Sequence, residues 1–150
     1  MADAPERKFR MKRVDALSPK VWALLVAMDA KCFDDAAPPL TDNSGAWWVV
    51  YRGNTPVAFG AIKQSSWSDK GGYLHRAAVL PAYRGNGLQK LLIRKRLAYA
   101  KEQEWEWVVT DTSNNAASGN SLISSGFRMY TPTVPWSFSY ACYWKKFIKP

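Results

Sequence analysis

The stretch from Tyr73 to Leu92, YLHRAAVLPAYRGNGLQKLL, constrains the fold of this chain more than any other part of it. Tyr73–Leu80 is rich in Val, Leu and Ala, which predicts a β-strand. The strand is expected to end at Pro81, because proline has no backbone N–H to donate to a neighbouring strand. A basic, glycine-containing loop follows, and a helix is predicted from Leu88. A strand, a tight loop and a helix in this order are typical of a sheet flanked by helices.

The loop Arg84-Gly85-Asn86-Gly87 predicts a binding site for an anion. Its two glycines allow successive backbone N–H groups to point into one concavity, and the positive end of the helix from Leu88 faces the same place. Arg84 adds a planar guanidinium that suits a phosphate, so a diphosphate would fit. A P-loop would need Gly-Lys-Ser/Thr and a dinucleotide fingerprint would need a third glycine, and the sequence has neither.

Length and cysteine content favour a single domain over residues 1–150 in a reducing compartment. A chain of 150 residues can bury about 70% of the surface of its unfolded form without disulfides. Its two cysteines, Cys32 and Cys142, are expected to be small buried residues rather than catalytic thiols. The N-terminus lacks the apolar core of a signal peptide and no apolar run is long enough to span a bilayer, so we expect a cytoplasmic protein.

The formal net charge of +9 suits an anionic cofactor. Basic residues are dense in residues 1–13, which we expect to be a flexible basic arm, and again directly after the glycine loop. The charge leaves open a contact with an acidic protein or with nucleic acid. No nucleic-acid-binding motif accompanies it, however, and a solvated basic surface explains it more simply. Polycationic substrates such as aminoglycosides are disfavoured, because they need an acidic pocket.

The remaining patterns predict an α/β (α+β) domain with one mixed, twisted sheet and helices on both faces. The predicted helices begin at Pro19 with Ser18 as cap, run from Leu88 to about Gln103, and run from Asn114 or Asn115 as cap to Gly126. The further predicted strands are Trp47–Tyr51, Pro56–Gln64, Trp105–Thr112, Arg128–Val134 and Ser137–Ile148. For Phe9–Asp15 the sequence does not decide between a flexible arm and a strand. For Asp34–Gly45 it does not decide between a loop that covers a site and a short helix.

Side-chain spacing predicts two apolar faces. The helix from Leu88 presents an apolar stripe that Lys95 interrupts, consisting of Leu88, Leu91, Leu92, Ala98 and Tyr99. The last strand places Phe138, Tyr140, Cys142 and Trp144 on one side. An aromatic face of this kind could support a dimer, so the choice between monomer and homodimer stays open.

Two motifs resemble the GNAT superfamily of N-acetyltransferases. The acetyl-CoA motif of that family is Gln/Arg-x-x-Gly-x-Gly/Ala, and here it reads Arg84-Gly85-Asn86-Gly87-Leu88-Gln89, with Gln89 where the family has Gly or Ala. The second motif, Asn-x-x-Ala/Ser-x-x-x-Tyr/Leu-x-x-x-Gly-Phe, is matched from Asn115 to Phe127. Two motifs at the family's spacing identify the chain as a member, which implies a GNAT-like sheet of six to seven strands.

The resemblance implies how acetyl-CoA would bind as the acetyl donor, without a metal. The pyrophosphate would be held by Arg84, Gly85, Asn86, Gly87, Leu88 and Gln89. The backbone of Val79 and Leu80 would pair with the pantetheine arm, and Asn115 would bond to the same arm where two strands separate. Ser118 and Leu122 are further cofactor-side positions of the second motif. The N–H of Val79 would also donate to the carbonyl oxygen of the reacting thioester.

His75, the only histidine, is the predicted general base. Acetyl transfer needs a neutral amine, whereas an alkyl amine with a pKa of about 10 is protonated at neutral pH. The segment Tyr73–Val79 resembles the strand that carries a His-Leu-His pair in arylalkylamine N-acetyltransferases. His75 matches the second histidine, and Tyr73 stands in place of the first as a further catalytic candidate. The alternative for His75 is a strand histidine hydrogen-bonded to the backbone.

The general acid and the role of the tryptophans stay open. Leu122 occupies a position where many relatives have a tyrosine, and it cannot donate a proton. The thiolate leaves to water, or a hydroxyl of Tyr130, Tyr143 or Ser121 protonates it. Four of the eight tryptophans, Trp47, Trp48, Trp67 and Trp136, either form an aromatic acceptor pocket or pack the sheet, and packing is the simpler explanation.

We therefore predict an N-acetyltransferase that moves an acetyl group from acetyl-CoA to a primary amine by direct transfer in a ternary complex. The acceptor is a small amine or a protein amine, and no membrane is expected as a partner. The alternative is a non-catalytic acyl-CoA-binding module, which would engage an acidic protein or nucleic acid through its basic face. The missing tyrosine at position 122 is what keeps that alternative open.

Overall fold

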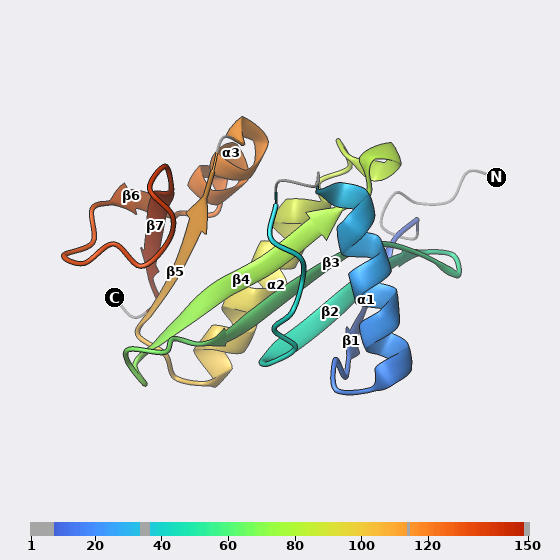
Figure 1. Cartoon of the computed structure of the whole chain (residues 1–150), viewed down its shortest axis with the longest axis horizontal. Helices are drawn as coiled ribbons and strands as arrows, with labels where there is room; N and C mark the ends of the chain where they lie inside the picture. Colours follow the sequence, from blue (N-terminus) through green and yellow to red (C-terminus); the bar gives the residue numbers. More distant parts are fainter. Residues whose placement is uncertain (1–7, 34–36, 114, 149–150) are drawn as a thin grey trace. The chain divides into compact units, whose positions relative to one another are not determined.

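Seven strands form one sheet, in the order β1-β2-β3-β4-β5-β7-β6 (Figure 1). The structure is a computed structural model, and it describes residues 8–33, 37–113 and 115–148. Its strands are β1 (Arg10–Val14), β2 (Ala46–Arg52), β3 (Thr55–Gln64), β4 (Gly71–Val79), β5 (Trp107–Thr112), β6 (Arg128–Tyr130) and β7 (Cys142–Phe147). Its helices are α1 (Pro19–Cys32), the 3-10 turn η2 (Pro81–Tyr83), α2 (Leu88–Glu102) and α3 (Ala116–Ser124). The parallel β4–β5 pair beside antiparallel pairs confirms the predicted mixed α/β class.

Residues 1–13 were predicted to form a flexible basic arm, but residues 10–13 belong to strand β1. β1 pairs antiparallel with β2, and the strand alternative for Phe9–Asp15 therefore holds over residues 10–14. Arg10 and Arg13 lie over the rings of Tyr51 and Trp48, with the guanidinium carbons 4.8 and 5.4 Å from the ring centroids. Residues 1–7 of the arm and 34–36 of the expected lid lie outside the described residues, and residues 37–45 form an irregular loop.

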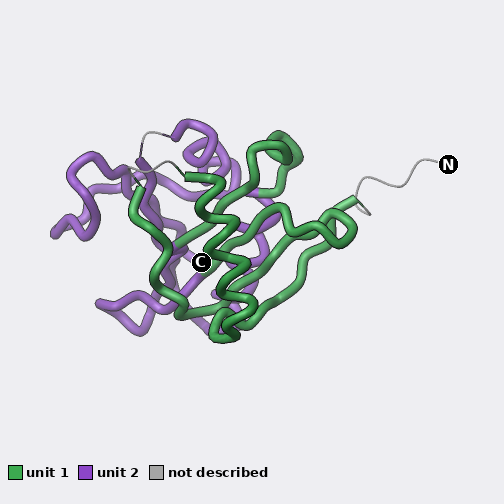
Figure 2. Tube along the Cα trace, turned by 45° about the vertical axis from the view of Figure 1, so that its right-hand side comes forward, with its two compact units in different colours: residues 1–61, 76–88 green, residues 62–75, 89–150 purple. Residues whose placement is uncertain are grey.

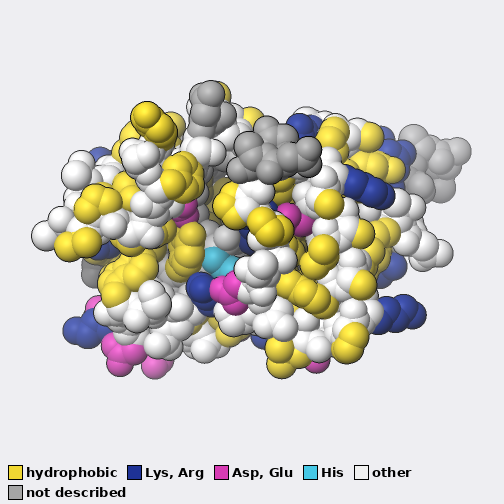
Figure 3. All heavy atoms as spheres, viewed as in Figure 1, with side chains coloured by type: hydrophobic (Ala, Val, Ile, Leu, Met, Phe, Trp, Pro, Cys, Tyr) yellow, Lys and Arg dark blue, Asp and Glu magenta, His cyan; other side chains and the backbone are white. Residues whose placement is uncertain are grey.

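The predicted C-terminal strands are too long. β6 has three residues and β7 begins only at Cys142, so residues 131–141 form a loop. Two prolines remove backbone donors from this segment, which explains why it does not join the sheet. The predicted apolar face is therefore wrong at Phe138 and Tyr140, which are 52% and 88% exposed in the loop. Apolar side chains gather on the surface over β6, β7 and this loop (Figure 3).

Contacts divide the chain into two compact units (Figure 2). The first consists of residues 1–61 and 76–88, and α1 packs there onto strand residues. The buried cluster comprises Ala16, Leu25, Met28, Trp47, Val49, Phe59, Ala61 and Ala78. Trp47 is fully buried at its centre, edge-on to Trp22 at 5.7 Å and stacked on Phe59 at 5.9 Å between ring centroids.

A buried ion pair joins α1 to β4 in this unit. Arg76 donates Nε to Oδ1 and Nη2 to Oδ2 of Asp29, both at 2.8 Å, and Nη2 also donates to the Pro38 carbonyl at 2.9 Å. The Asp29 side chain is only 6% exposed, and the guanidinium lies over the Phe33 ring at 4.4 Å. The two-pronged geometry fixes α1 against the strand and supplies the hydrogen bonds that a buried carboxylate requires.

The second unit consists of residues 62–75 and 89–150, and it contains most of helix α2. In the predicted apolar stripe of α2, Leu88 and Leu92 are buried and Leu91 and Tyr99 are half-buried, but Ala98 is exposed. The helix also buries Ile93, Arg96 and Ala100. These buried positions follow a helical period that runs through an arginine, because the long apolar stem of Arg96 packs like a hydrophobic residue. Burial lowers the pKa of Arg96 to about 9, and its Nε donates to the Leu92 carbonyl at 3.1 Å.

Replacing Asp29 tests the buried ion pair. Asp29→Ala leaves the Arg76 guanidinium without its carboxylate, and we expect the free energy of unfolding to fall by about 3 kcal/mol. The exposed loop residue Asp69 provides the control, because Asp69→Ala makes the same charge change and should cost less than about 0.5 kcal/mol. Urea unfolding of both variants gives the comparison, and equal losses would contradict the assigned role of the pair.

Candidate active site

β4 contains one extra residue relative to β3. Leu80 donates its N–H to the Val57 carbonyl, and Ser65 donates to that of Gly71, both at 2.9 Å. Val57 and Ser65 are eight positions apart, whereas their partners Leu80 and Gly71 are nine apart, so β4 carries a β-bulge between these points. Bulges change the direction of the side chains and backbone groups that follow them, and they are common beside active sites.

The pairing of β4 with β5 is short. It runs from Gly71↔Trp107 to Tyr73↔Val109, after which the Thr110 hydroxyl donates to the Leu74 carbonyl at 2.9 Å. Gly71 and Gly72 are required at the start of β4, because a Cβ atom there would overlap the rings of Trp107 and Trp105. Because this pairing ends at Tyr73, β4 and β5 separate beyond that residue, as predicted for the two strands at the cofactor site.

Val79 and Leu80, the two residues whose backbone was predicted to pair with the cofactor, differ in their hydrogen bonds. The N–H of Leu80 donates to Val57, and its carbonyl accepts from Tyr83 N at 2.9 Å, so both groups are used within the protein. Because successive N–H groups of a strand point to opposite sides, the N–H of Val79 is directed away from β3. The carbonyl of Val79 accepts from Arg84 Nε at 3.3 Å. Val79 thus has the geometry expected of a backbone donor to a ligand, and Leu80 does not.

The glycine loop is left-handed at both of its glycines. η2 ends at Tyr83, whose carbonyl accepts from Asn86 Nδ2 at 2.8 Å. Gly85 and Gly87 have φ angles of 83° and 74°, in the left-handed region. A Cβ atom would meet nothing within 4 Å at either position, so glycine is needed for its backbone conformation and not for space. The loop is exposed, and Leu88 follows directly as the first residue of α2.

The second motif forms the start of α3. Asn115 is the N-cap and accepts from the Ser118 N–H at 3.0 Å, which decides between the two predicted caps; Asn114 lies outside the described residues. Because the cap bond uses the side-chain oxygen of Asn115, its amide N–H₂ is the group that could reach a ligand. Ser118 is half-buried and Leu122 is buried. The aliphatic side chain of Leu122 has no ionisable proton, so it cannot act as an acid.

His75 is half-buried on β4, and neither of its ring nitrogens is accessible to solvent. Its ring centroid lies 6.1 Å from that of Tyr73. Nitrogens that water cannot reach are also closed to an acceptor amine, so a role as base requires that the groups covering the ring move when ligands bind.

A hydrogen-bond network on Asp111 was not predicted from the sequence. Tyr73 donates its hydroxyl to Oδ1 of Asp111 and Ser137 donates its hydroxyl to Oδ2, both at 2.6 Å. Asp111 lies on β5, and Ser137 lies in the β6–β7 loop. One signal could have found Asp111, since it is the only charged residue in the otherwise apolar or hydroxyl-bearing strand WVVTDT.

The candidate acids Tyr130 and Tyr143 hold the β6–β7 loop. Tyr130 accepts from Trp136 Nε1 at 3.1 Å, and Tyr143 accepts from the Ser137 N–H at 3.0 Å. Burial raises the pKa of Tyr130, against the smaller opposite effect of the Trp136 hydrogen bond. Both hydroxyls are thus engaged in shaping the loop. Ser121, the third candidate, uses its carbonyl to accept from Ser125.

The tryptophans divide into two groups. Trp47 and Trp48 are 0% and 3% exposed and pack the first unit, so the packing explanation holds for them. Trp67 and Trp136 belong to the second unit, and their ring centroids are 5.3 Å apart. Trp136 also meets the ring of Tyr73 at 5.2 Å, and Trp67 is 49% exposed.

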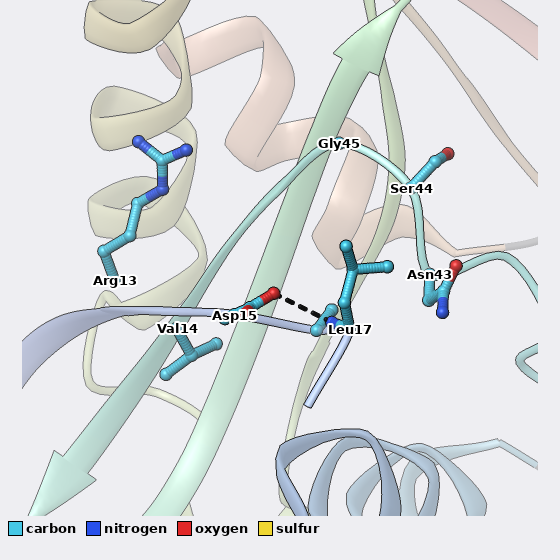
Figure 4. Close-up of a pocket in the computed structure, with 8 residues that line it drawn as sticks. Arg13, Val14, Asp15, Leu17, Asn43, Ser44 and Gly45 are labelled. Carbon is cyan, nitrogen blue, oxygen red and sulfur yellow. Dashed lines mark hydrogen bonds between the residues drawn. The ribbon is translucent and has the colours of Figure 1, made fainter. Parts of the chain in front are cut away.

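A hollow of about 620 Å³ lies elsewhere in the first unit (Figure 4). Residues 13–17 and 43–45 line it, and Asp15 accepts from the Leu17 N–H beside it. None of the predicted site residues contributes to its wall, so we do not assign the reaction to this hollow. Within the described ranges, no three His, Cys, Asp or Glu residues are grouped to hold a metal ion, and no helix is long and apolar enough to cross a membrane.

Comparison with known proteins gives a family and a fold. The sequence profile of the acetyltransferase (GNAT) family matches residues 15–120. The ribosomal-protein-S18-alanine N-acetyltransferase of Escherichia coli is similar in structure, with a TM-score of 0.73, 14% identity and 95% of each chain covered. YncA of Salmonella typhimurium, solved with its cofactor acetyl-CoA, has a TM-score of 0.67 and 15% identity, also over 95% of each chain. An N-acetyltransferase of Staphylococcus aureus Mu50 has a TM-score of 0.72 and 15% identity over 94% of this chain and 99% of that one. No curated protein sequence matches the chain.

Cys32 and Cys142 are half-buried and not fully buried as predicted, and the reactivity of Cys32 tests how far the protein covers its thiol. Burial raises the pKa of this thiol, against the smaller opposite effect of the Arg84 charge, so little thiolate is present at neutral pH. In Cys142→Ser, where Cys32 is the only thiol, alkylation by iodoacetamide at neutral pH should be slower than that of glutathione. The rate should rise with pH, with a midpoint above about 8.5. Alkylation as fast as that of glutathione would contradict the structural role of this cysteine.

Proposed function

Because the chain belongs to the acetyltransferase (GNAT) family, we propose that it transfers the acetyl group of acetyl-CoA to a primary amine by direct attack in a ternary complex. Members of this family take the acetyl group from acetyl-CoA, so the chain is an acetyl-CoA-dependent acyltransferase. The observation that supports acetyl-CoA as the donor is the glycine loop after η2, with Gly85 and Gly87 in left-handed conformations directly before α2.

The donor side is built from backbone groups and one guanidinium. The left-handed glycines allow the loop N–H groups to face a pyrophosphate, and the N-terminus of α2 and the Arg84 charge act in the same direction. Gln89 occupies the last motif position within the first turn of α2. The N–H of Val79 and the amide N–H₂ of Asn115 are donors suited to a pantetheine arm. The exposure of the loop fits a ligand that approaches from solvent.

The acceptor side needs a base. Bound acetyl-CoA supplies a thioester; as its acetyl group passes to the amine, a C–N bond forms and the C–S bond breaks. A protonated amine cannot attack, and His75 is the group proposed to remove its proton. The N–H of Val79 would stabilise the negative charge that develops on the carbonyl oxygen. Because the pKa of a thiol is about 8.5, the thiolate of coenzyme A can leave without a proton donor, and leucine at position 122 does not prevent the reaction.

Arg84→Gln tests the donor side. Loss of a charge-assisted hydrogen bond to phosphate should raise the Kd for acetyl-CoA by roughly 10- to 100-fold, measured by calorimetry. Arg52→Gln, at the exposed last residue of β2, removes the same charge and serves as the matched control, because long-range attraction falls equally in both variants. An equal change in the two variants would argue against a phosphate contact at Arg84.

His75→Ala tests the base. We expect the rate to fall about 100- to 10,000-fold, together with loss of the acidic limb of the pH–rate profile, because proton removal then depends on solvent. The affinity for acetyl-CoA should stay unchanged, which controls for folding. If both the rate and the acidic limb persist in the variant, another group is the base.

Turnover against different amines tests the transfer itself. CoA-thiol release from acetyl-CoA should respond to at least one of three pools: small amines, peptides with a free N-terminus, and peptides whose only amine is lysine. The responding pool identifies the acceptor class. A protein that binds acetyl-CoA and releases no thiol with any pool would be evidence against amine acetylation.

A further inference from the structure

The second unit carries an aromatic cluster that reaches the surface at Trp67. It consists of Trp67, Tyr73, Trp107, Trp136 and Tyr143. Trp67 stacks on Trp107 at 6.2 Å and lies 5.3 Å from Trp136, which in turn lies 5.2 Å from Tyr73 and 4.8 Å from Tyr143. Trp67 is 49% exposed, in contrast to the tryptophans of the first unit. An exposed indole beside half-buried aromatic rings is a surface suited to a flat apolar molecule.

A carboxylate lies within this cluster. Asp111 accepts hydrogen bonds from Tyr73 and Ser137, and these two bonds use only two of the roughly four lone-pair positions of a carboxylate. It can therefore also accept N–H groups of an ammonium ion. The combination of aromatic faces with a carboxylate is a chemistry that recognises ammonium ligands.

Two lysines border the same cluster. Lys63 Nζ lies 5.9 Å from the ring centroid of Tyr73, and Lys145 Nζ lies 5.1 Å from that of Trp107. A ligand with one positive charge can place it at Asp111. A second positive charge on the ligand would meet one of the lysines, which disfavours polyamines.

The strand register brings Asp111 to the level of the proposed base. Tyr73 is paired with Val109, and both strands run in the same direction, so Asp111 and His75 each lie two residues beyond the last paired position. The β6–β7 loop completes this region, because Trp136 and Ser137 attach it to Tyr73, Asp111 and Tyr143.

We propose that Tyr73, Asp111, Trp67, Trp136 and Ser137 form the acceptor subsite, and that it takes a primary amine with a single positive charge on a flat apolar body. Asp111 binds the ammonium group at the level of His75, and the indoles of Trp67 and Trp136 hold the apolar body. The inference rests on the proposed transfer to an amine and names the class of that amine. Asp111 acts here by binding the acceptor, while removal of its proton remains the role of His75.

Calorimetric titration of the full chain, saturated with coenzyme A that carries no acetyl group, tests the subsite without turnover. We expect 2-phenylethylamine to bind, whereas 2-phenylethanol, which lacks the charge, binds at least roughly tenfold more weakly. Spermidine, with several charges and no ring, should not bind measurably. Equal affinities for the amine and the alcohol, or tighter binding of spermidine, would overturn the proposal.

Two variants locate the binding. Asp111→Asn should weaken 2-phenylethylamine at least roughly tenfold, whereas Asp69→Asn, with the same charge change in an exposed loop, should not. Because Asp111→Asn can disturb the β6–β7 loop, the half-exposed Trp67 gives an independent variant. Trp67→Ala should weaken 2-phenylethylamine severalfold and leave methylamine and acetyl-CoA unaffected. Unchanged amine affinity in both variants would overturn the subsite.

Steady-state kinetics separates this inference from the proposed function. If the enzyme acetylates amines, Asp111→Asn should raise the KM for 2-phenylethylamine and leave the KM for acetyl-CoA unchanged. If the enzyme acetylates 2-phenylethylamine and neither Asp111→Asn nor Trp67→Ala changes the KM for this amine, the proposed function would stand and the subsite would be wrong. Binding of 2-phenylethylamine that depends on Asp111, without any acetylation, would support the subsite and overturn the function.

Discussion

The backbone of β4 is the constraint on which the rest of the site depends. The strand pairs with β3 at both of its ends, yet its pairing with β5 covers only Gly71, Gly72 and Tyr73. One extra residue relative to β3 makes this possible, because a bulge changes the direction of the groups that follow it. The N–H of Val79 is consequently directed away from β3, and Pro81 turns the chain into the glycine loop directly after the same strand.

Local charges matter more to this site than the net charge of +9. Exposed charges farther apart than about 10 Å are largely screened at moderate ionic strength, so a ligand responds mainly to its nearest groups. In the proposed site, the glycine loop would offer Arg84 and backbone donors to an anion, and Asp111 would offer a carboxylate among aromatic rings to a cation. This arrangement would let a basic chain bind an anionic donor and an acceptor with a single positive charge.

Local sequence signals predicted the parts of the site that are built from backbone conformation. Pro81 ends β4, Gly85 and Gly87 are left-handed, and Asn115 caps α3, as their residue types require. The same reasoning placed the final strands too far into the β6–β7 loop, and it missed the arginine in the buried stripe of α2. Apolar spacing cannot distinguish an exposed loop aromatic from a strand residue, nor recognise that the stem of Arg96 packs as a hydrophobic group.

The sequence by itself determined where the three α-helices begin and where β4 ends, because proline and cap residues act on the few residues around them. Only the tertiary structure decided which distant side chains meet. Tyr73 and Asp111 are 38 residues apart and are joined because β4 and β5 are parallel neighbours. The same cause left Trp47 buried and Trp67 exposed, since residues of one type are buried to different extents according to which strands and loops pack around them.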